Sequence, residues 1–302
     1  MLTNSVSELV INWHLTEACN FGCKYCYSAW VKERGTRDVV KSKTASHELI
    51  SEIYSFFRPG NTANPLYNKM KWESVRLNFA GGEPLLHGDR IPDLVRIASE
   101  VGFKTSLITN GSRLSASLLG EIAPYMSWLG LSLDSTSDQA NRQIGRVDRR
   151  GGLLDLAELS ENVVAEMRNH PALKLKINTV VNALNVDEDF TDLILRISPN
   201  KWKILRMLPV VNQNLAVNDL EFRAFVERHH AFRDVYRVED NDEMLESYIM
   251  IDPLGRFYQN GEETLRNGYQ YSPPILRTGT AAAFANMRLS AERYAARYSE
   301  VA

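Results

Sequence analysis

The chain has 302 residues, of which 44% are hydrophobic and 24% are charged, and its formal net charge is −2. This composition is that of an ordinary globular protein with room for a large core. The near-neutral charge argues against binding to a nucleic-acid polymer, because such binding usually leaves a basic footprint. The sequence has neither the pattern of a signal peptide nor a run of roughly 18 apolar residues, as a membrane span needs. We therefore expect a cytoplasmic protein that does not bind membranes. A monomer is the expected state, although no feature of the sequence indicates it.

Short apolar runs alternate with stretches of helical period along most of the chain. The predicted strands, in chain order, are 9–15, 74–79, 104–109, 128–133, 173–181 and 202–208. The predicted helices between them are 44–57, 91–101, 114–123, 152–169 and 187–197. Such repeated alternation predicts an α/β fold with a mainly parallel sheet and helices outside it.

The remaining segments are less regular. We predict a surface loop at 58–73, a helix at 219–234, a strand in the run SYIMID and a helical tail at 280–298. Residues 1–250 are expected to form one barrel-like domain, and 251–302 a C-terminal extension that covers the active site. In parallel α/β sheets the chemistry lies at the carboxyl ends of the strands, so the loops after the strands are the segments to search for a site.

All three cysteines of the chain lie within eight residues, at Cys19, Cys23 and Cys26, directly after the first predicted strand. A tight loop around Gly22 can bring three thiolates together, as a 4Fe–4S cluster requires, and would leave one iron open to another molecule. Two alternatives remain at this point. His14 could complete a zinc site with the cysteines, or the three thiols could simply be buried neighbours.

The motif AGGEP follows the second predicted strand, and TNGS at 109–112 and the pair Ser132 and Asp134 follow the next two. Glycines allow close backbone approach to a ligand, and Glu83 offers a carboxylate to an ammonium group. Cysteine spacing and motif order together resemble the radical S-adenosylmethionine superfamily. The resemblance implies a partial (βα)6 TIM-like barrel and S-adenosylmethionine bound to the open iron. The cofactor residues it implies are Gly81, Gly82, Glu83, Pro84, Asn110, Ser132 and Tyr25.

Longer blocks of sequence narrow the resemblance to the prokaryotic viperins. They include the segment from Asn12 to Thr16, NFAGGEP, LITNGS, LSLDS, KINTVVNALNVDED, NKWKILR and ESYIMIDPLGRF. The similarity implies a ribonucleoside triphosphate substrate, either CTP, UTP or GTP. It implies removal of the 4′ hydrogen and loss of the 3′ hydroxyl as water, which gives a chain-terminating antiviral 3′-deoxy-3′,4′-didehydro nucleotide.

Basic side chains on or just after the predicted strands agree with a triphosphate substrate. Strands of a parallel barrel are usually apolar, whereas several of these carry cations that suit about four negative charges. The implied substrate residues are Asn12, His14, Arg76, Arg146, Lys176, Asn178, Lys201, Lys203 and Tyr248. Among them His14 and Tyr248 are the candidate catalytic residues, and Tyr248 could donate a proton or a hydrogen atom.

Other functions remain open at this stage. A radical enzyme of this superfamily could act on a peptide, a zinc-stabilised protein could bind a ligand without redox chemistry, and an inactive relative could bind nucleotide only. As an enzyme of the superfamily the chain would need a reductant such as flavodoxin or ferredoxin.

Overall fold

The structure is a computed structural model that describes residues 4–26, 38–209, 212–240, 246–259, 269–285 and 287–298. Tyr27, which the sequence predicts to shield the cluster together with Phe21 and Tyr25, lies outside these residues. The chain divides into two compact units. Unit 1 comprises 1–17, 32–106 and 242–302, and unit 2 comprises 18–31 and 107–241.

The strands of unit 1 lie in the order β10-β9-β8-β1-β2. They are β1 (Asn4–His14), β2 (Met70–Ala80), β8 (Ile249–Ile251), β9 (Arg256–Gln259) and β10 (Gln270–Pro274). β1 is parallel to β2 and β8, whereas β9 is antiparallel to its neighbours β8 and β10. Along β1 the odd-numbered Leu9, Ile11 and Trp13 are buried in the core, while Glu8 and Asn12 are only partly buried. The odd-numbered face of the strand therefore lies in the core, and the other face carries Glu8 and Asn12 beside the buried Val10.

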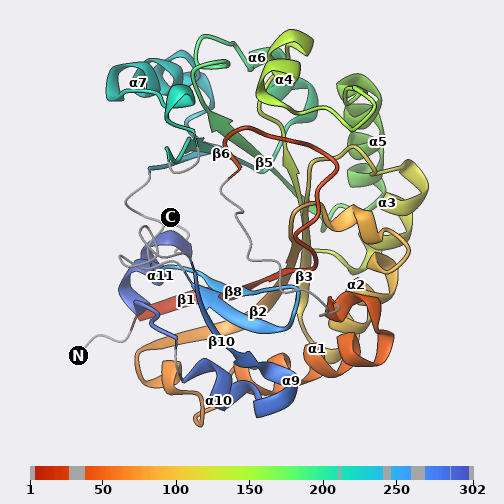
Figure 1. Cartoon of the computed structure of the whole chain (residues 1–302), viewed down its shortest axis with the longest axis vertical. Helices are drawn as coiled ribbons and strands as arrows, with labels where there is room; N and C mark the ends of the chain where they lie inside the picture. The colour runs from red at the N-terminus through yellow and green to blue at the C-terminus, as the bar shows by residue number, and fades with distance from the viewer. Residues whose placement is uncertain are drawn as a thin grey trace. The chain divides into compact units, whose positions relative to one another are not determined.

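The helices of unit 1 include α1 (Lys43–Phe57) and α2 (Ile91–Val101), with α9 (Ile275–Thr278), α10 (Thr280–Phe284) and α11 (Ala291–Tyr298) near the C-terminus. Helix α1 contacts α2, α9 and α10, and α11 contacts β1 (Figure 1). The Ser42 side chain caps the start of α1 by accepting from the Ala45 backbone N–H. The last fifty residues thus add strands and helices to unit 1; that they cover the active site stays a prediction.

The strands of unit 2 are parallel and lie in the order β4 (Trp128–Ser132), β5 (Lys174–Val181), β6 (Lys201–Arg206) and β7 (Tyr236–Glu239). The helices of this unit are α3 (Ala116–Ile122), α4 (Asp138–Ile144), α5 (Leu156–Asn169), α6 (Thr191–Ile197) and α7 (Asp219–Arg228). Helix α5 contacts both α3 and α6 (Figure 1). Strand β3 (Lys104–Thr109) is divided between the units after Ser106.

Most predicted elements are confirmed, and the differences have physical reasons. Helix α4 was missed because its seven residues, DQANRQI, are largely polar, although Ser137 and Gly145 cap its two ends. The predicted loop 58–73 contains a short 3-10 helix, Pro65–Asn68, and the start of β2. The predicted tail helix is broken, since α10 ends at Phe284 and α11 begins at Ala291. In the described part of the chain, no helix has the length and apolar character to cross a membrane.

Candidate active site

The cysteine loop of unit 2 presents Cys19, Cys23 and Cys26, none of which is part of a disulfide. The sulfur of Cys19 accepts hydrogen bonds from the Phe21 backbone N–H at 3.4 Å and from Asn110 Nδ2 at 3.9 Å. Burial raises the pKa of Cys23 to about 11, which favours the protonated thiol, whereas a bound metal favours the thiolate. The two N–H donors to the sulfur of Cys19 stabilise a negatively charged thiolate there. The loop is therefore suited to provide thiolate ligands.

The cysteine loop is held against the C-terminal end of α4 by its backbone. Gly22 N–H donates to Gly145 O at 3.0 Å, and Lys24 N–H donates to Ile144 O at 2.9 Å. Gly145 has a φ of 93°, and a Cβ there would lie 2.3 Å from Gly22 O. The close approach of the two backbones therefore requires glycine at position 145.

A buried side-chain network reinforces this docking. Asp134, which is 1% exposed, accepts hydrogen bonds from the Tyr25 hydroxyl, from Arg146 Nη1 at 2.6 Å and from Val180 N–H at 2.7 Å. Burial and the nearby Asp134 raise the pKa of Tyr25 well above its usual value, so Tyr25 is the donor. Burial alone would lower the pKa of Arg146, but the Asp134 carboxylate raises it, so the guanidinium stays charged. Asp134 thus joins the cysteine loop to β4, β5 and α4.

In unit 1 the GGEP segment is packed against the end of β1. Gly82 N–H donates to Thr16 O at 2.7 Å, and a Cβ at Gly81 would lie 2.8 Å from that oxygen. Glu83 is 1% exposed, and its Oε1 accepts from Leu85 N–H at 2.9 Å, which caps the 3-10 helix Pro84–His87. This hydrogen bond fixes the orientation of a buried carboxylate, as binding to an ammonium group requires.

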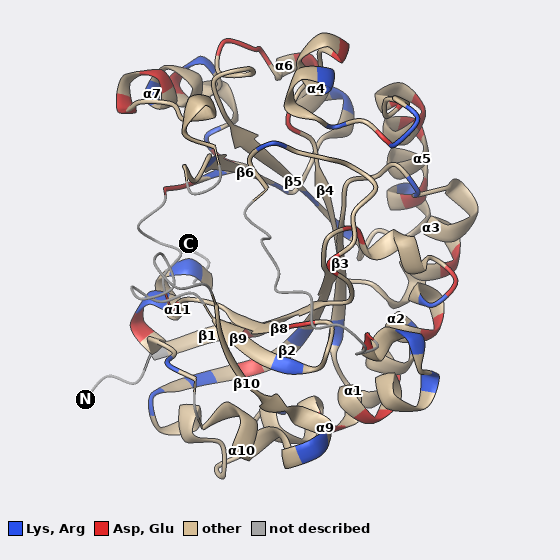
Figure 2. Cartoon of the chain, in the orientation of Figure 1, with Lys and Arg blue, Asp and Glu red and all other residues tan. Residues whose placement is uncertain are grey.

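In unit 2 the strands β4, β5 and β6 are parallel and in register. Most of the predicted cofactor and substrate residues on them therefore lie beside one another, in two rows that run across the strands. Ser132 pairs with Asn178 and Asn178 with Lys203, while Lys176 pairs with Gly130 and with Lys201. Paired residues of neighbouring strands share a face of the sheet, so these side chains lie on one face. A Cβ at Gly130 would lie 3.3 Å from Lys176 Cε, so the glycine leaves space for the lysine. Figure 2 marks the basic residues of β5 and β6 in blue.

Three of the predicted phosphate-binding cations already have acidic neighbours. Arg76 Nε lies 2.8 Å from Glu8 Oε2, Lys203 is paired with Glu239 on β7, and Arg146 is paired with Asp134. Arg146 is only 6% exposed, and its guanidinium also donates to the Ser132 carbonyl oxygen. Their role in phosphate binding stays a prediction, and the structure gives Arg146 an additional place in the network behind the cysteine loop.

The candidate catalytic residues His14 and Tyr248 both belong to unit 1. Burial lowers the pKa of His14 to about 4, so its ring is neutral at physiological pH. The ring lies edge-on to Tyr258, with centroids 5.6 Å apart. The Tyr248 hydroxyl accepts from Arg297 Nη1 on α11, whose guanidinium carbon lies 4.2 Å from the Tyr248 ring centroid. Arg297 was not predicted from the sequence, since nothing in the tail pattern relates it to Tyr248.

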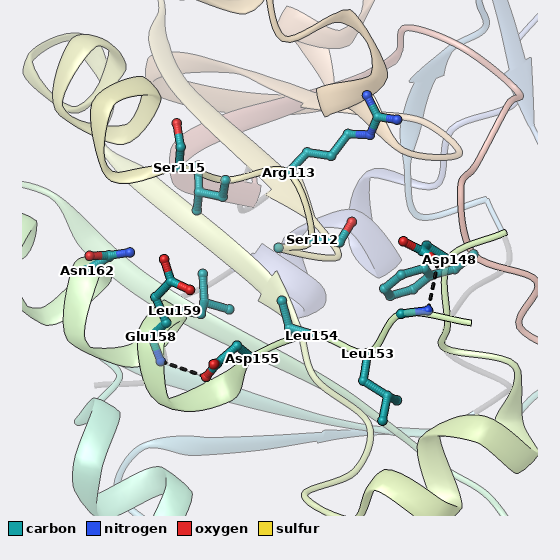
Figure 3. Close-up of a pocket in the computed structure, with 14 residues that line it drawn as sticks. Ser112, Arg113, Ser115, Asp148, Leu153, Leu154, Asp155, Glu158, Leu159 and Asn162 are labelled. Atoms are coloured by element: carbon teal, nitrogen blue, oxygen red, sulfur yellow. Dashed lines mark hydrogen bonds between the residues drawn. The ribbon is translucent and has the colours of Figure 1, made fainter. Parts of the chain in front are cut away.

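A pocket of about 390 Å³ in unit 2 borders the cysteine loop at Phe21 (Figure 3). The segment after β3 and the segment before α5 form most of its wall. Two of its carboxylates serve local turns, because Asp148 accepts from Gly152 N–H at 2.8 Å and Asp155 caps α5 by accepting from Glu158 N–H at 2.9 Å. Ser112 in the wall accepts from Asn20 Nδ2 at 2.8 Å, which links the pocket wall to the cysteine loop.

Comparison with known proteins agrees with this geometry. Residues 13–162 match the model of the radical SAM superfamily. The S-adenosylmethionine-dependent nucleotide dehydratase of Pseudoalteromonas ulvae is 40% identical over 98% of this chain and 95% of its own length. The protein of the same name from Psychrobacter lutiphocae is 39% identical over 96% of this chain and 95% of its own. The chain belongs to the S-adenosylmethionine-dependent nucleotide dehydratase family.

The fold of this family member is that of the radical SAM enzymes. The solved structure of native anSMEcpe with bound AdoMet aligns with a TM-score of 0.65 over 97% of this chain and 83% of that one, at 13% identity. This likeness confirms the predicted α/β partial barrel. As a radical SAM protein the chain uses a 4Fe–4S cluster and S-adenosylmethionine, which decides against the zinc alternative. Three cysteines outside any disulfide and the oriented Glu83 are the ligand types that these two groups need, although among the described residues no three such side chains are grouped closely enough to hold a metal ion.

Proposed function

We propose that this family member converts a ribonucleoside triphosphate, CTP, UTP or GTP, to its 3′-deoxy-3′,4′-didehydro analogue. The observation that carries the proposal is the 40% identity to a nucleotide dehydratase over nearly the whole of both chains. The product lacks a 3′ hydroxyl, so a polymerase that incorporates it cannot extend the strand, which suits an antiviral role. We also propose that the enzyme is a cytoplasmic monomer without nucleic-acid or membrane partners.

The cofactors and the protein have separate tasks in this proposal. When bound by Cys19, Cys23 and Cys26, the reduced cluster with S-adenosylmethionine supplies the 5′-deoxyadenosyl radical that removes the 4′ hydrogen. The chain holds the methionine part with Glu83 and the GGEP backbone. The other cofactor contacts are assigned to Asn110, Ser132 and Tyr25. An external reductant, such as flavodoxin or ferredoxin, supplies the electrons.

Loss of the 3′ hydroxyl as water from the C4′ radical consumes one proton and one electron. Tyr248 is the proposed source of the proton. Because Arg297 donates to the Tyr248 oxygen and lies over its ring, the phenol is held in place and its own O–H is directed away from Arg297. His14, neutral at physiological pH, would hold the ribose by a hydrogen bond.

The substrate phosphates are assigned to the basic rows of unit 2. A triphosphate carries about four negative charges and is well matched by several lysine and arginine side chains. Lys176 and Lys201 are paired residues of β5 and β6, and Asn178 and Lys203 form the next pair. The proposed triphosphate-binding set is Lys176, Asn178, Lys201 and Lys203, with Arg76 and Arg146 as further cations.

Anaerobic incubation tests the proposed function. Reconstituted protein with S-adenosylmethionine and dithionite should form 5′-deoxyadenosine faster when one of CTP, UTP or GTP is added, and that nucleotide should lose the mass of one water. Chromatography with mass spectrometry measures both products. Release of 5′-deoxyadenosine that no nucleotide accelerates would show that the substrate is of another class, such as a peptide.

A further inference from the structure

A chain of polar side chains crosses four neighbouring strands of unit 1 on the face that carries Asn12. Ser106 Oγ donates to Asn78 Oδ1 at 2.7 Å, and Asn78 Nδ2 donates to Asn12 Oδ1 at 2.8 Å. Asn12 Nδ2 then donates to the backbone oxygen of Ile249 on β8 at 3.4 Å. Asn12 and Asn78 are paired residues in the parallel register of β1 and β2. We call the side chains of Ser106, Asn78 and Asn12 the amide ladder.

The direction of the amide ladder is set by its last partner. The Ile249 carbonyl oxygen can only accept, so the NH2 group of Asn12 faces β8 and its oxygen faces Asn78. Asn78 must therefore turn its NH2 group to Asn12 and its oxygen to Ser106, whose hydroxyl becomes the donor. A flip of either amide would bring two acceptors or two donors face to face, which is costly in a buried place. Asn78 and Ser106 are each 3% exposed, so water cannot easily relieve such a mismatch.

Only one member of the amide ladder is accessible to a ligand. Asn12 is partly exposed, whereas Asn78 and Ser106 are buried. The oxygen of Asn12 is occupied by Asn78, and one of its N–H groups is directed at Ile249. Among the described residues, nothing else engages the second N–H of Asn12. A ligand at this position therefore meets a hydrogen-bond donor and must offer an acceptor.

We propose that Ser106 and Asn78 are positioning residues that hold the Asn12 amide so that its N–H binds the 2′-hydroxyl oxygen of the nucleotide ribose. This inference rests on the proposed function. The 3′ hydroxyl leaves in the proposed reaction, so the 2′ oxygen is the ribose hydroxyl oxygen that substrate and product share. An interaction that is equal in the ground state and the transition state affects KM and not kcat. The amide ladder would thus make the enzyme selective for ribose over 2′-deoxyribose.

The test compares ribonucleotide and 2′-deoxyribonucleotide as substrates of the reconstituted enzyme. Ser106→Ala removes the first donor of the amide ladder without touching Asn12. We expect it to raise KM for the ribonucleotide about fivefold, as for one lost hydrogen bond, and to leave kcat unchanged. The preference for ribonucleotide over 2′-deoxyribonucleotide should fall by the same factor. Asn78→Asp, which places two acceptors face to face, should have a larger effect of the same kind.

Two control variants separate positioning from general weakening of the sheet. Ser106→Thr keeps the hydroxyl and should restore both KM and sugar preference. Ser74→Ala removes a hydroxyl of β2 that lies outside the amide ladder and donates to Ser7 O at 3.1 Å, and it should change neither. An unchanged sugar preference in Ser106→Ala and Asn78→Asp would overturn the inference alone. If the wild-type enzyme converts no nucleotide, the proposed function fails, and this inference with it.

Discussion

Replacing Cys23 with serine is expected to reduce 5′-deoxyadenosine formation to background. A serine hydroxyl does not replace a thiolate as a cluster ligand, and the chain has no fourth cysteine to take over. The purified variant should contain little iron after anaerobic reconstitution and should lack the visible absorption of the wild type. Iron analysis and chromatography of the reaction products measure the two effects.

Lys24→Gln is the matched control for this loss. Its side chain is exposed in the same loop, and its backbone N–H, which the substitution retains, contacts Ile144 O. We expect wild-type iron content and activity from this control. A Cys23→Ser variant that keeps its iron and its product would show that the cysteine loop does not hold the cluster.

Asp134→Ala is expected to give the largest loss of stability. The substitution leaves the charged Arg146 guanidinium buried without its carboxylate and removes the acceptor of Tyr25 and of Val180 N–H. Breaking a buried ion pair on one side costs about 3–5 kcal/mol of unfolding free energy. Because Asp134 also joins Tyr25 to the sheet, the cysteine loop should retain its cluster poorly. Thermal unfolding of the apoprotein and iron content after reconstitution measure the two consequences.

The exposed Asp138 of α4 provides the control for this variant, since Asp138→Ala should cost less than about 1 kcal/mol. The double variant Asp134→Ala with Arg146→Met should recover part of the lost stability, because it removes the unpaired buried charge. Equal melting temperatures for Asp134→Ala and Asp138→Ala would contradict the role assigned to Asp134.

The sequence predicts which basic residues lie on the strands of the site, but it does not predict their acidic partners. The alternation with apolar neighbours is enough to place Lys176 and Asn178 on one side of their strand, and Lys201 and Lys203 on one side of theirs. That all four share one face depends on the register of β5 with β6. The acidic partner of Lys203 could not be predicted, since Glu239 ends a four-residue strand that carries little periodic signal. Burial of Arg146 was also missed, because it depends on helix α4, whose polar sequence does not mark it as helical.

The amide ladder shows a different limit of the sequence. Asn78 stood within a predicted buried strand, VRLNF, and a polar residue there was a usable sign of a specific partner. The partner itself depends on the register of β1 with β2 and on Ser106 in the strand β3. Register is a property of the packed sheet, so the pairing became visible only in the structure.

Transfer of deuterium from the 4′ carbon tests the central claim most directly. The wild-type enzyme is incubated anaerobically with S-adenosylmethionine, a reductant and a ribonucleoside triphosphate that carries deuterium only at C4′. We expect 5′-deoxyadenosine with one deuterium atom, formed together with a nucleotide that has lost the 3′ hydroxyl and the label. Unlabelled 5′-deoxyadenosine, or nucleotide recovered with its label and its hydroxyl intact, would contradict this claim.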